Sequence, residues 1–178
     1  MALRDAVKDA HDKAEQHRFV KLLFSGFIPA EVYADYLFNQ LQCYSTLEVK
    51  AAQLGILTGL EGMERTYAIS QDLLELAPET VRLHPATVAY TEHLDTLDEK
   101  GLLAHIYVRH MGDMYGGQMI KKHVPGNATM YDFENRSELI AALRAKLSDD
   151  LGNEANKAFD MAIRLFDEVA DAHGISAT

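Results

Sequence analysis

The sequence predicts an all-α fold, a compact multi-helix bundle in which residues 1–178 form one domain. Only four prolines interrupt the chain, and between them apolar residues recur three and four positions apart, as on amphipathic helices that share a core. Strand signals, which are runs of alternating β-branched residues flanked by turn pairs, are almost absent. With 48 % hydrophobic residues the chain can build a core large enough to enclose a ligand. We expect disorder in the last few residues.

The first three helices are predicted from apolar spacing and from prolines. The first carries a buried stripe at spacings of four, three and four residues, made of Leu3, Val7, Ala10 and Ala14. Pro29 suits an early position of the second helix, which runs through 31–54. A third helix spans 61–76 and stops before Pro78. We interpret this third helix, and the one that follows it, as packing helices.

The remaining helices follow from the same signals. Pro85 opens a helix over 86–101, and Gly101 is expected to end it. The next helix covers 102–124 and is closed by Pro125. Two more complete the chain, over 137–151 and 154–173. The sequence shows no internal repeat, linker or low-complexity tract, so a single bundle is the expected arrangement.

Charge and cysteine content narrow the class of protein. Seventeen basic against 27 acidic side chains give a formal net charge of −10, which disfavours non-specific binding of nucleic acids. Cys43 is the single cysteine, so the chain cannot hold an internal disulfide or a cysteine cluster for a metal. The N-terminal stretch is charged throughout, and no segment approaches the roughly 20 apolar residues of a membrane span. We expect a soluble cytoplasmic protein that binds neither nucleic acid nor membranes.

Three polar residues of the first predicted helix share one face. Arg4, Lys8 and His11 are four and three positions apart, which places them within roughly 60° of one another. A neutral imidazole is a good axial ligand for haem iron, and two cations could bind the propionates of the same porphyrin. The alternative is that both cations pair with aspartates of the same helix and that His11 is simply exposed. Taken alone, this helix favours the alternative.

A second unusual feature is a helix that carries three glycines. Gly112, Gly116 and Gly117 stand inside a helical pattern, and each costs about 1 kcal/mol relative to alanine. Gly112 and Gly116 lie one turn apart, so they clear side chains from a stripe that a flat macrocycle could approach. Asp113 lies beside this stripe and could hold water near an iron-bound oxygen ligand. Close helix packing and an ordinary surface aspartate are the alternatives.

With these two helices the sequence resembles the haem oxygenase family. The family's proximal-helix pattern, a histidine followed after two residues by Ala-Glu, matches HDKAE, with His11, Ala14 and Glu15 in place. The distal-helix pattern of Gly-Asp, two variable residues, Gly-Gly-Gln and paired lysines matches GDMYGGQMIKK at 112–122. One departure is Tyr115, where the family commonly has serine. The resemblance spans nearly the whole chain and is clearest in these two motifs.

The resemblance implies a role for each matching residue. His11 is the proximal iron ligand, and Gly112 and Gly116 let the distal helix bend over the haem. Asp113 anchors the distal water network. Further catalytic and haem-contacting positions, matched by motif or spacing, are Arg109, Tyr44 in YSTLE, Gly117, and Tyr107, Arg4 and Lys8 for the propionates. Phe159 and Phe166 are expected to line the pocket, and the candidates for the last propionate-binding cations are Arg144 and Lys146.

The resemblance also implies the reaction. Haem b is both cofactor and substrate, and O2 with reducing equivalents opens its ring to biliverdin, with a preference for the IXα isomer, carbon monoxide and ferrous iron. The electron donor is expected to be ferredoxin, with a flavoprotein reductase as alternative. Lys121 and Lys122 are candidates for a basic docking face on this acidic chain.

Rival functions differ in what they require of the sequence. A haem carrier or sensor would keep the fold and His11 without turnover. A thiaminase-like hydrolase would need Cys43 as nucleophile, although buried packing is the commoner role of a free cysteine. A ferritin-like di-iron protein is disfavoured, because the chain contains no Glu-x-x-His pair.

Overall fold

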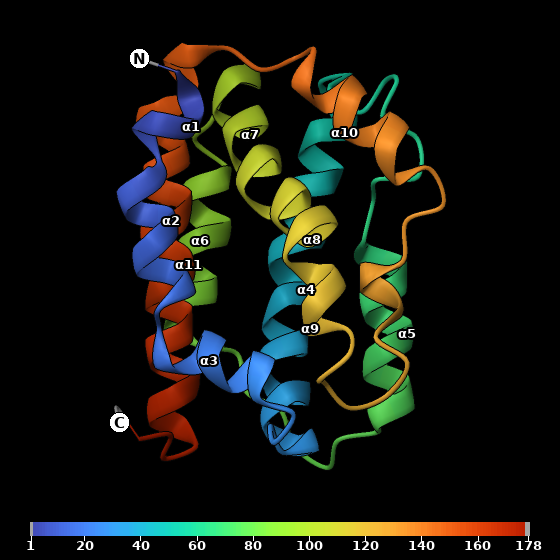
Figure 1. Cartoon of the computed structure of the whole chain (residues 1–178), viewed down its shortest axis with the longest axis vertical. Coiled ribbons are helices and arrows are strands. Elements are labelled where there is room, and N and C mark those ends of the chain that lie inside the picture. The colour runs from blue at the N-terminus through green and yellow to red at the C-terminus, as the bar shows by residue number, and fades with distance from the viewer. Residues whose placement is uncertain (1, 177–178) are drawn as a thin grey trace.

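The computed structural model describes residues 2–176 and contains helices and loops with no β-strand in that range. The all-α prediction is therefore confirmed (Figure 1). Of the C-terminal residues expected to be disordered, 177 and 178 lie outside the described range. Within the described residues, no helix has both the length and the apolar character that crossing a bilayer requires.

The described helices are joined by turns and by longer loops, among them 54–65 between α4 and α5. In chain order the α-helices are α1 (Leu3–Ala6), α2 (Lys8–Glu15), α3 (Arg18–Ser25), α4 (Ala30–Gln53), α5 (Thr66–Leu76), α6 (Pro85–Leu94), α7 (Glu99–Ile106), α8 (Gly112–Tyr115), α9 (Gly117–Ile120), α10 (Arg136–Arg144) and α11 (Gly152–Ala172). A π-helical segment, η1 (Tyr107–Met111), joins α7 to α8, and two 3₁₀ turns are η2 (Thr129–Tyr131) and η3 (Asp149–Leu151).

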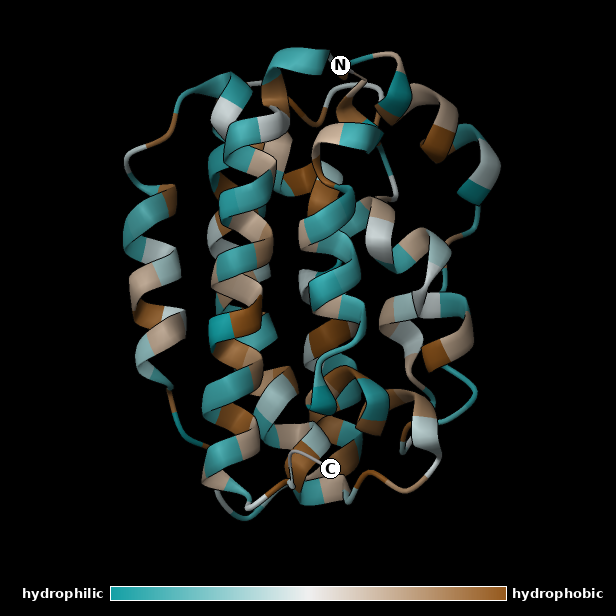
Figure 2. Ribbon diagram, turned by 60° about the vertical axis from the view of Figure 1, so that its left-hand side comes forward, coloured by the Kyte–Doolittle hydropathy of each residue, from teal (hydrophilic) through white to brown (hydrophobic). Residues whose placement is uncertain are grey.

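Two long helices, α4 and α11, organise the bundle. Helix α11 packs along α2, α3, α6 and α7, and α4 packs against α5, α6 and α7. Figure 1 shows α1, α2, α6 and α11 as one column, with α7, α8 and α9 descending beside it in front of α4. Figure 2 shows apolar and hydrophilic residues alternating along these helices, as expected of amphipathic helices that share a core. The α1–α2 segment and the α7–α9 segment thus form two facing walls.

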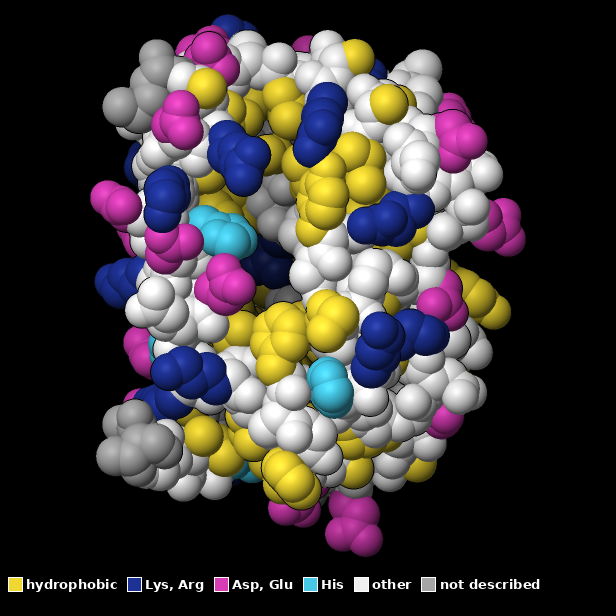
Figure 3. Space-filling model, in the orientation of Figure 1, with side chains coloured by type: hydrophobic (Ala, Val, Ile, Leu, Met, Phe, Trp, Pro, Cys, Tyr) yellow, Lys and Arg dark blue, Asp and Glu magenta, His cyan; other side chains and the backbone are white. Residues whose placement is uncertain are grey.

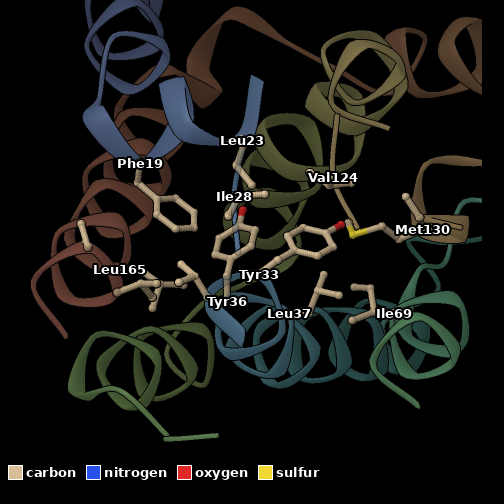
Figure 4. Packing of buried hydrophobic residues seen from close by; sticks show 14 of the residues in the cluster. Phe19, Leu23, Ile28, Tyr33, Tyr36, Leu37, Ile69, Val124, Met130 and Leu165 are labelled. Atoms are coloured by element: carbon tan, nitrogen blue, oxygen red, sulfur yellow. The ribbon is translucent and has the colours of Figure 1, made fainter. Parts of the chain in front are cut away.

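The core consists of separate clusters of buried apolar side chains. At one end Tyr33 and Leu37 of α4 pack with Phe19 and Leu23 of α3 and with Leu165 of α11 (Figure 4). A second cluster joins α4, α7 and α10, through residues that include Leu47, Leu102, Ile106, Leu139 and Leu143. Fully burying one side chain of this size contributes roughly 1.5–3 kcal/mol to stability. Both clusters anchor α4, which is why its polar residues have defined positions.

Several predicted boundaries were wrong in the N-terminal half. The first helix is divided at Val7, whose backbone leaves helical geometry at φ −102° and ψ 0°. Helix α3 was not predicted; it begins where the His17 imidazole accepts the Phe19 N–H at 3.0 Å and ends at Gly26, with φ +83°. The helix expected over 61–76 begins only at Thr66.

A buried arginine explains the late start of α5. Arg65 donates hydrogen bonds to the carbonyls of Gly62, Met63 and Glu64 and, across the fold, to those of Met130 and Asp132. These bonds hold the preceding loop around the guanidinium and keep its carbonyls out of a helical ladder.

In the C-terminal half the largest error concerns Gly101. It lies inside α7 instead of ending the preceding helix, which stops at Leu94. The Asp98 side chain caps α7 by accepting the Gly101 N–H at 2.9 Å. A Cβ at Gly101 would lie 3.0 Å from the Leu97 side chain, so this glycine permits a close turn. The helices expected over 102–124 and 137–151 end early, at Ile120 and Arg144.

Candidate active site

A cleft separates the α1–α2 wall from the α7–α9 wall. The space-filling view shows a deep hollow between them, with a histidine at one edge and basic side chains around the rim (Figure 3). His11 belongs to α2, and its side chain is 56 % exposed. Its ring meets the edge of Phe159 on α11, with centroids 5.8 Å apart, and its Nδ1 lies 3.6 Å from the carboxylates of Asp12 and Glu15. The imidazole is thus positioned and accessible to a ligand.

The cations expected near a propionate have different surroundings. Burial raises the pKa of Tyr107, while the positive charges of Arg4 and Arg144 act in the opposite direction. Both guanidinium groups are therefore close enough to influence this half-buried tyrosine. Lys8 instead pairs with Asp12 one turn along the helix, at 2.7 Å and in solvent.

The other sequence-predicted residues on the edge of the site are spread apart. Phe166 lies in the core cluster around α3, where its ring stacks on Phe19 at 5.8 Å and contacts Tyr36 at 6.2 Å. Lys146 follows α10 and borders a shallow pocket with residues of α7 and of the loop after α4.

The distal wall begins with a π-helical segment that the sequence patterns did not predict. Residues Tyr107–Met111 form η1, and they precede Gly112 directly. The wider turn of a π-helix inserts one extra residue, and such segments are frequent at functional sites. Here it buries the side chains of Arg109 and His110 between α4 and the distal wall.

The three glycines of the distal wall have different neighbours. A Cβ built on Gly112 meets no described atom within 4 Å, and one on Gly116 meets the Gly112 carbonyl at 3.5 Å. A Cβ on Gly117 would lie 2.8 Å from Cε1 of Tyr131, too close for a real side chain. Gly112 therefore faces open space, whereas Gly117 packs against the interior. The sequence left ligand approach and close packing as alternatives for the glycines. The open space at Gly112 leaves room for a ligand, and the contact at Gly117 is close packing.

Asp113 is the carboxyl of the distal wall. It is partly buried and accepts a hydrogen bond from the Tyr44 hydroxyl of α4. Burial raises the pKa of Asp113 to about 6, against the opposing effects of the Tyr44 hydrogen bond and of His110, Arg109 and Arg65. A group with this pKa can take up and release a proton near neutral pH.

Arg109 supports this arrangement from the buried side. Its Nε donates to the Tyr90 hydroxyl at 2.9 Å and its Nη1 to Oε1 of Gln40 at 3.0 Å. The guanidinium carbon lies 4.3 Å from the ring centre of Tyr90 and 5.5 Å from that of Tyr44. Arg109 is thus a buried positioning residue that connects α4, α6 and η1.

Two buried groups beside Asp113 received no functional assignment from the sequence. His110 is fully buried, and its Nε2 lies 2.7 Å from Oε2 of Glu48. Glu48 also accepts the backbone N–H groups of Arg65 and Thr66, at 2.7 and 3.0 Å. Glu48 is the last residue of the YSTLE motif, so that motif carried a signal for it as well as for Tyr44.

Comparison with known proteins identifies the family. The sequence profile described as "Heme oxygenase" matches residues 1–168. The chain belongs to the haem oxygenase family. Heme oxygenase 2 of Oryctolagus cuniculus is 29 % identical over 99 % of the chain and 67 % of its own length. Heme oxygenase 1 of a Nostoc species is 28 % identical over 94 % of the chain and 84 % of its own length.

Solved structures show the same haem oxygenase fold. Heme oxygenase-1 of the cyanobacterium Synechocystis, in complex with heme, is 26 % identical with a TM-score of 0.81, covering 97 % of this chain and 94 % of that one. The haem oxygenase of Leptospira interrogans, at 23 % identity, matches with a TM-score of 0.80 over 94 % of this chain and 100 % of that one. The resemblance read from the two motif helices is therefore confirmed at the level of family and fold.

Proposed function

We propose that this protein binds haem b in the cleft between α2 and α8 and opens its ring oxidatively, with O2 and reducing equivalents, to biliverdin, carbon monoxide and ferrous iron. The observation that carries the proposal is the pair of walls itself. An exposed histidine stands on α2, and a carboxyl of raised pKa stands beside a bare glycine on the distal wall. Membership of the haem oxygenase family and a relative solved in complex with heme support it.

The residues present fit a haem. A flat macrocycle needs a wall without side chains, and the open space at Gly112 provides one. His11 would hold the iron through its imidazole. The carboxylates of Asp12 and Glu15 near Nδ1 and the edge of Phe159 would orient the ring, as groups around metal-bound histidines commonly do.

The upper rim of the cleft supplies partners for the haem propionates. Arg4 and Tyr107 are near each other, with Arg144 beside them. Lys8 would have to exchange Asp12 for a propionate, which costs little because exposed ion pairs contribute only about 0–1 kcal/mol. Anchoring by these groups would fix the rotation of the haem and favour cleavage at the α-meso carbon.

The distal residues would hold and transfer protons. Bound haem iron supplies the activation of O2. Asp113 would hold a water molecule and pass protons through it, and a carboxyl acting through water delivers protons without touching the oxygen directly. Tyr44 fixes one Asp113 oxygen by donating to it, and Arg109 keeps α4 and η1 in register. Gly116 would let the distal wall move with the ligand.

We further propose a cytoplasmic protein that receives electrons from ferredoxin. Lys121 and Lys122 directly follow α9 of the distal wall, and Figure 3 shows grouped basic side chains on the face where the cleft opens. Lys121 pairs with Asp132 at 2.8 Å, and the Lys122 side chain is exposed. A basic patch on an acidic protein suits an acidic electron donor.

The decisive experiment is an absorption spectrum of the protein with one equivalent of haemin, followed after ascorbate or a ferredoxin reducing system is added in air. We expect loss of the Soret band and growth of a broad biliverdin band in the red. A stable Soret band under these conditions would instead identify a haem carrier or sensor, and absence of haem binding would overturn the proposal altogether.

A further inference from the structure

A cluster of possible metal ligands lies where α6, α7 and α11 meet, and it includes neither His11 nor Asp113. His93 of α6, His105 of α7 and Glu154 at the start of α11 each direct one ligand atom to a common point, and these atoms lie within 4.8 Å of one another. His93 Nε2 is 3.1 and 3.2 Å from the two Glu154 oxygens, and His105 Nε2 is 3.8 Å from Oε2. The consecutive helices α6 and α7 therefore meet α11, which is distant in the sequence, at one polar spot.

One atom of this cluster has no partner among the described residues. The His105 side chain is fully buried, yet its Nε2 forms no hydrogen bond. Buried polar atoms of native proteins nearly always have a partner, and an exception calls for an explanation such as a missing ion. The His105 Nε2 lies 3.8 Å from Oε2 of Glu154, just beyond hydrogen-bond distance, and a bridging cation would lie between these two atoms.

The spacing suits a small divalent ion. Three ligand atoms bound tetrahedrally at about 2.0–2.1 Å are roughly 3.4 Å from one another, and the observed separations of 3.1 and 3.8 Å lie on either side of that value. The side chains of His93 and Glu154 are 24 % and 17 % exposed, so the cluster has a path to solvent and room for water as a fourth ligand.

We propose that His93, His105 and Glu154 form a binding site for a divalent transition-metal ion, distinct from the haem iron. Two imidazoles and one carboxylate are a donor set that Zn²⁺ accepts readily in proteins. The site is a structural clamp between α6, α7 and α11.

The clamp is connected to the distal wall by hydrogen bonds. His105 Nδ1 lies 2.7 Å from the Tyr90 hydroxyl, and that hydroxyl accepts a hydrogen bond from Arg109. An ion at Nε2 places the ring proton of His105 on Nδ1, which then donates to Tyr90. Because the Tyr90 hydroxyl then accepts a hydrogen bond from Nδ1, its own proton must point elsewhere. Metal binding therefore changes the hydrogen bonding of a group that contacts Arg109.

The test has to separate this cluster from a second group with metal-ligand spacing. His11, Asp12 and Glu15 also hold three ligand atoms within 4.8 Å, in an exposed position on α2. We would strip the protein of metals with a chelator, titrate the haem-free protein with Zn²⁺ by calorimetry, and record the visible spectrum with Co²⁺. The variants are H93A and E154Q, with H11A as matched control.

We expect wild type and H11A to bind one equivalent of Zn²⁺ at the clamp, and H93A and E154Q to bind it at least roughly 10–100-fold more weakly. Zn²⁺ should raise the Tm of wild type and H11A, but not of the two clamp variants. In ¹⁵N spectra of wild type, Zn²⁺ should shift the His105 ring nitrogens. Equal affinity of H93A, E154Q and wild type, or loss of binding in H11A alone, would overturn the proposal. Because the titration uses haem-free protein, its outcome is independent of haem turnover.

Discussion

On the α2 side of the cleft the side chains are exposed and find partners within their own helix, whereas on the distal side they are buried and find partners on other helices. Lys8 pairs with Asp12, and His11 lies near Glu15, all one turn or less apart. Asp113 instead pairs with Tyr44, 69 positions away in the sequence. Changes on the α2 wall should therefore affect ligand binding with little effect on stability, while changes on the distal wall should affect chemistry and stability together.

The largest expected effect is at Asp113. D113A removes the carboxyl that would pass protons, so ring opening should fall by about 10²–10⁴-fold, the usual contribution of general acid–base catalysis. Haem binding should persist, because His11 and the rim are untouched. Biliverdin yield and a haemin titration of the Soret band measure the two effects. A normal biliverdin yield would remove Asp113 from the mechanism.

The next effect concerns the facing wall. H11A should weaken haem binding and abolish turnover, and added imidazole should restore part of both by entering the vacated position. Because His11 is exposed, its loss should change the free energy of unfolding by no more than about 0.5 kcal/mol. Haemin titration with and without imidazole, together with urea unfolding, checks this. A large loss of stability would contradict the contrast between the walls.

Two glycines of the distal wall provide a matched pair. G112A should stabilise the free protein by roughly 0.5–1 kcal/mol, because Gly112 is helical and its Cβ meets open space. It should also weaken haem binding. G117A should destabilise by about 1–3 kcal/mol, because the new Cβ would press on Tyr131. Thermal unfolding and haemin titration of both variants test the division, and similar behaviour of the two would refute it.

A smaller effect is a pH dependence of stability. The pKa of Asp113 is about 6 in the folded protein, above the ordinary value of 3.8. The folded state therefore holds an extra proton between these values, and the Asp113 contribution to stability falls as pH rises through this window. D113N has no titrating carboxyl at this position and does not lose stability in this way. The free energy of unfolding of D113N minus that of wild type should therefore increase between pH 4 and pH 6 and stay level above about pH 7. Urea unfolding at several pH values measures the difference, and a constant difference would exclude the raised pKa.

The smallest effect concerns the two lysines that follow α9. Exchanging Lys121 and Lys122 for glutamate should slow ferredoxin-driven turnover by about tenfold at low salt, and the difference should shrink as salt is added. Turnover driven by ascorbate needs no docking and should be unchanged. Rates that are equal with ferredoxin at every salt concentration would point to a different docking face.

Local sequence patterns predicted most of the fold and failed at particular places. The apolar stripes of α4 and α11 and the proline at the start of α6 were correctly interpreted. The late start of α5 was not, because it depends on Arg65 reaching carbonyls some 65 positions away. Gly101 was assigned to a helix end, although the side chain of Asp98 makes it part of a first turn.

The sequence by itself determined the helical class, because apolar spacing along a helix already decides which side chains share a face. Arg4, Lys8 and His11 on one wall, and Gly112, Asp113 and Gly116 on the other, were selected only once their spacing was combined with the resemblance to the two family motifs. Only the tertiary structure decided which group partners Asp113, where the π-helical turn lies, and that His93, His105 and Glu154 converge. These features depend on contacts between helices, and burial at such contacts alters a pKa or leaves an atom without a partner in ways that no local pattern records.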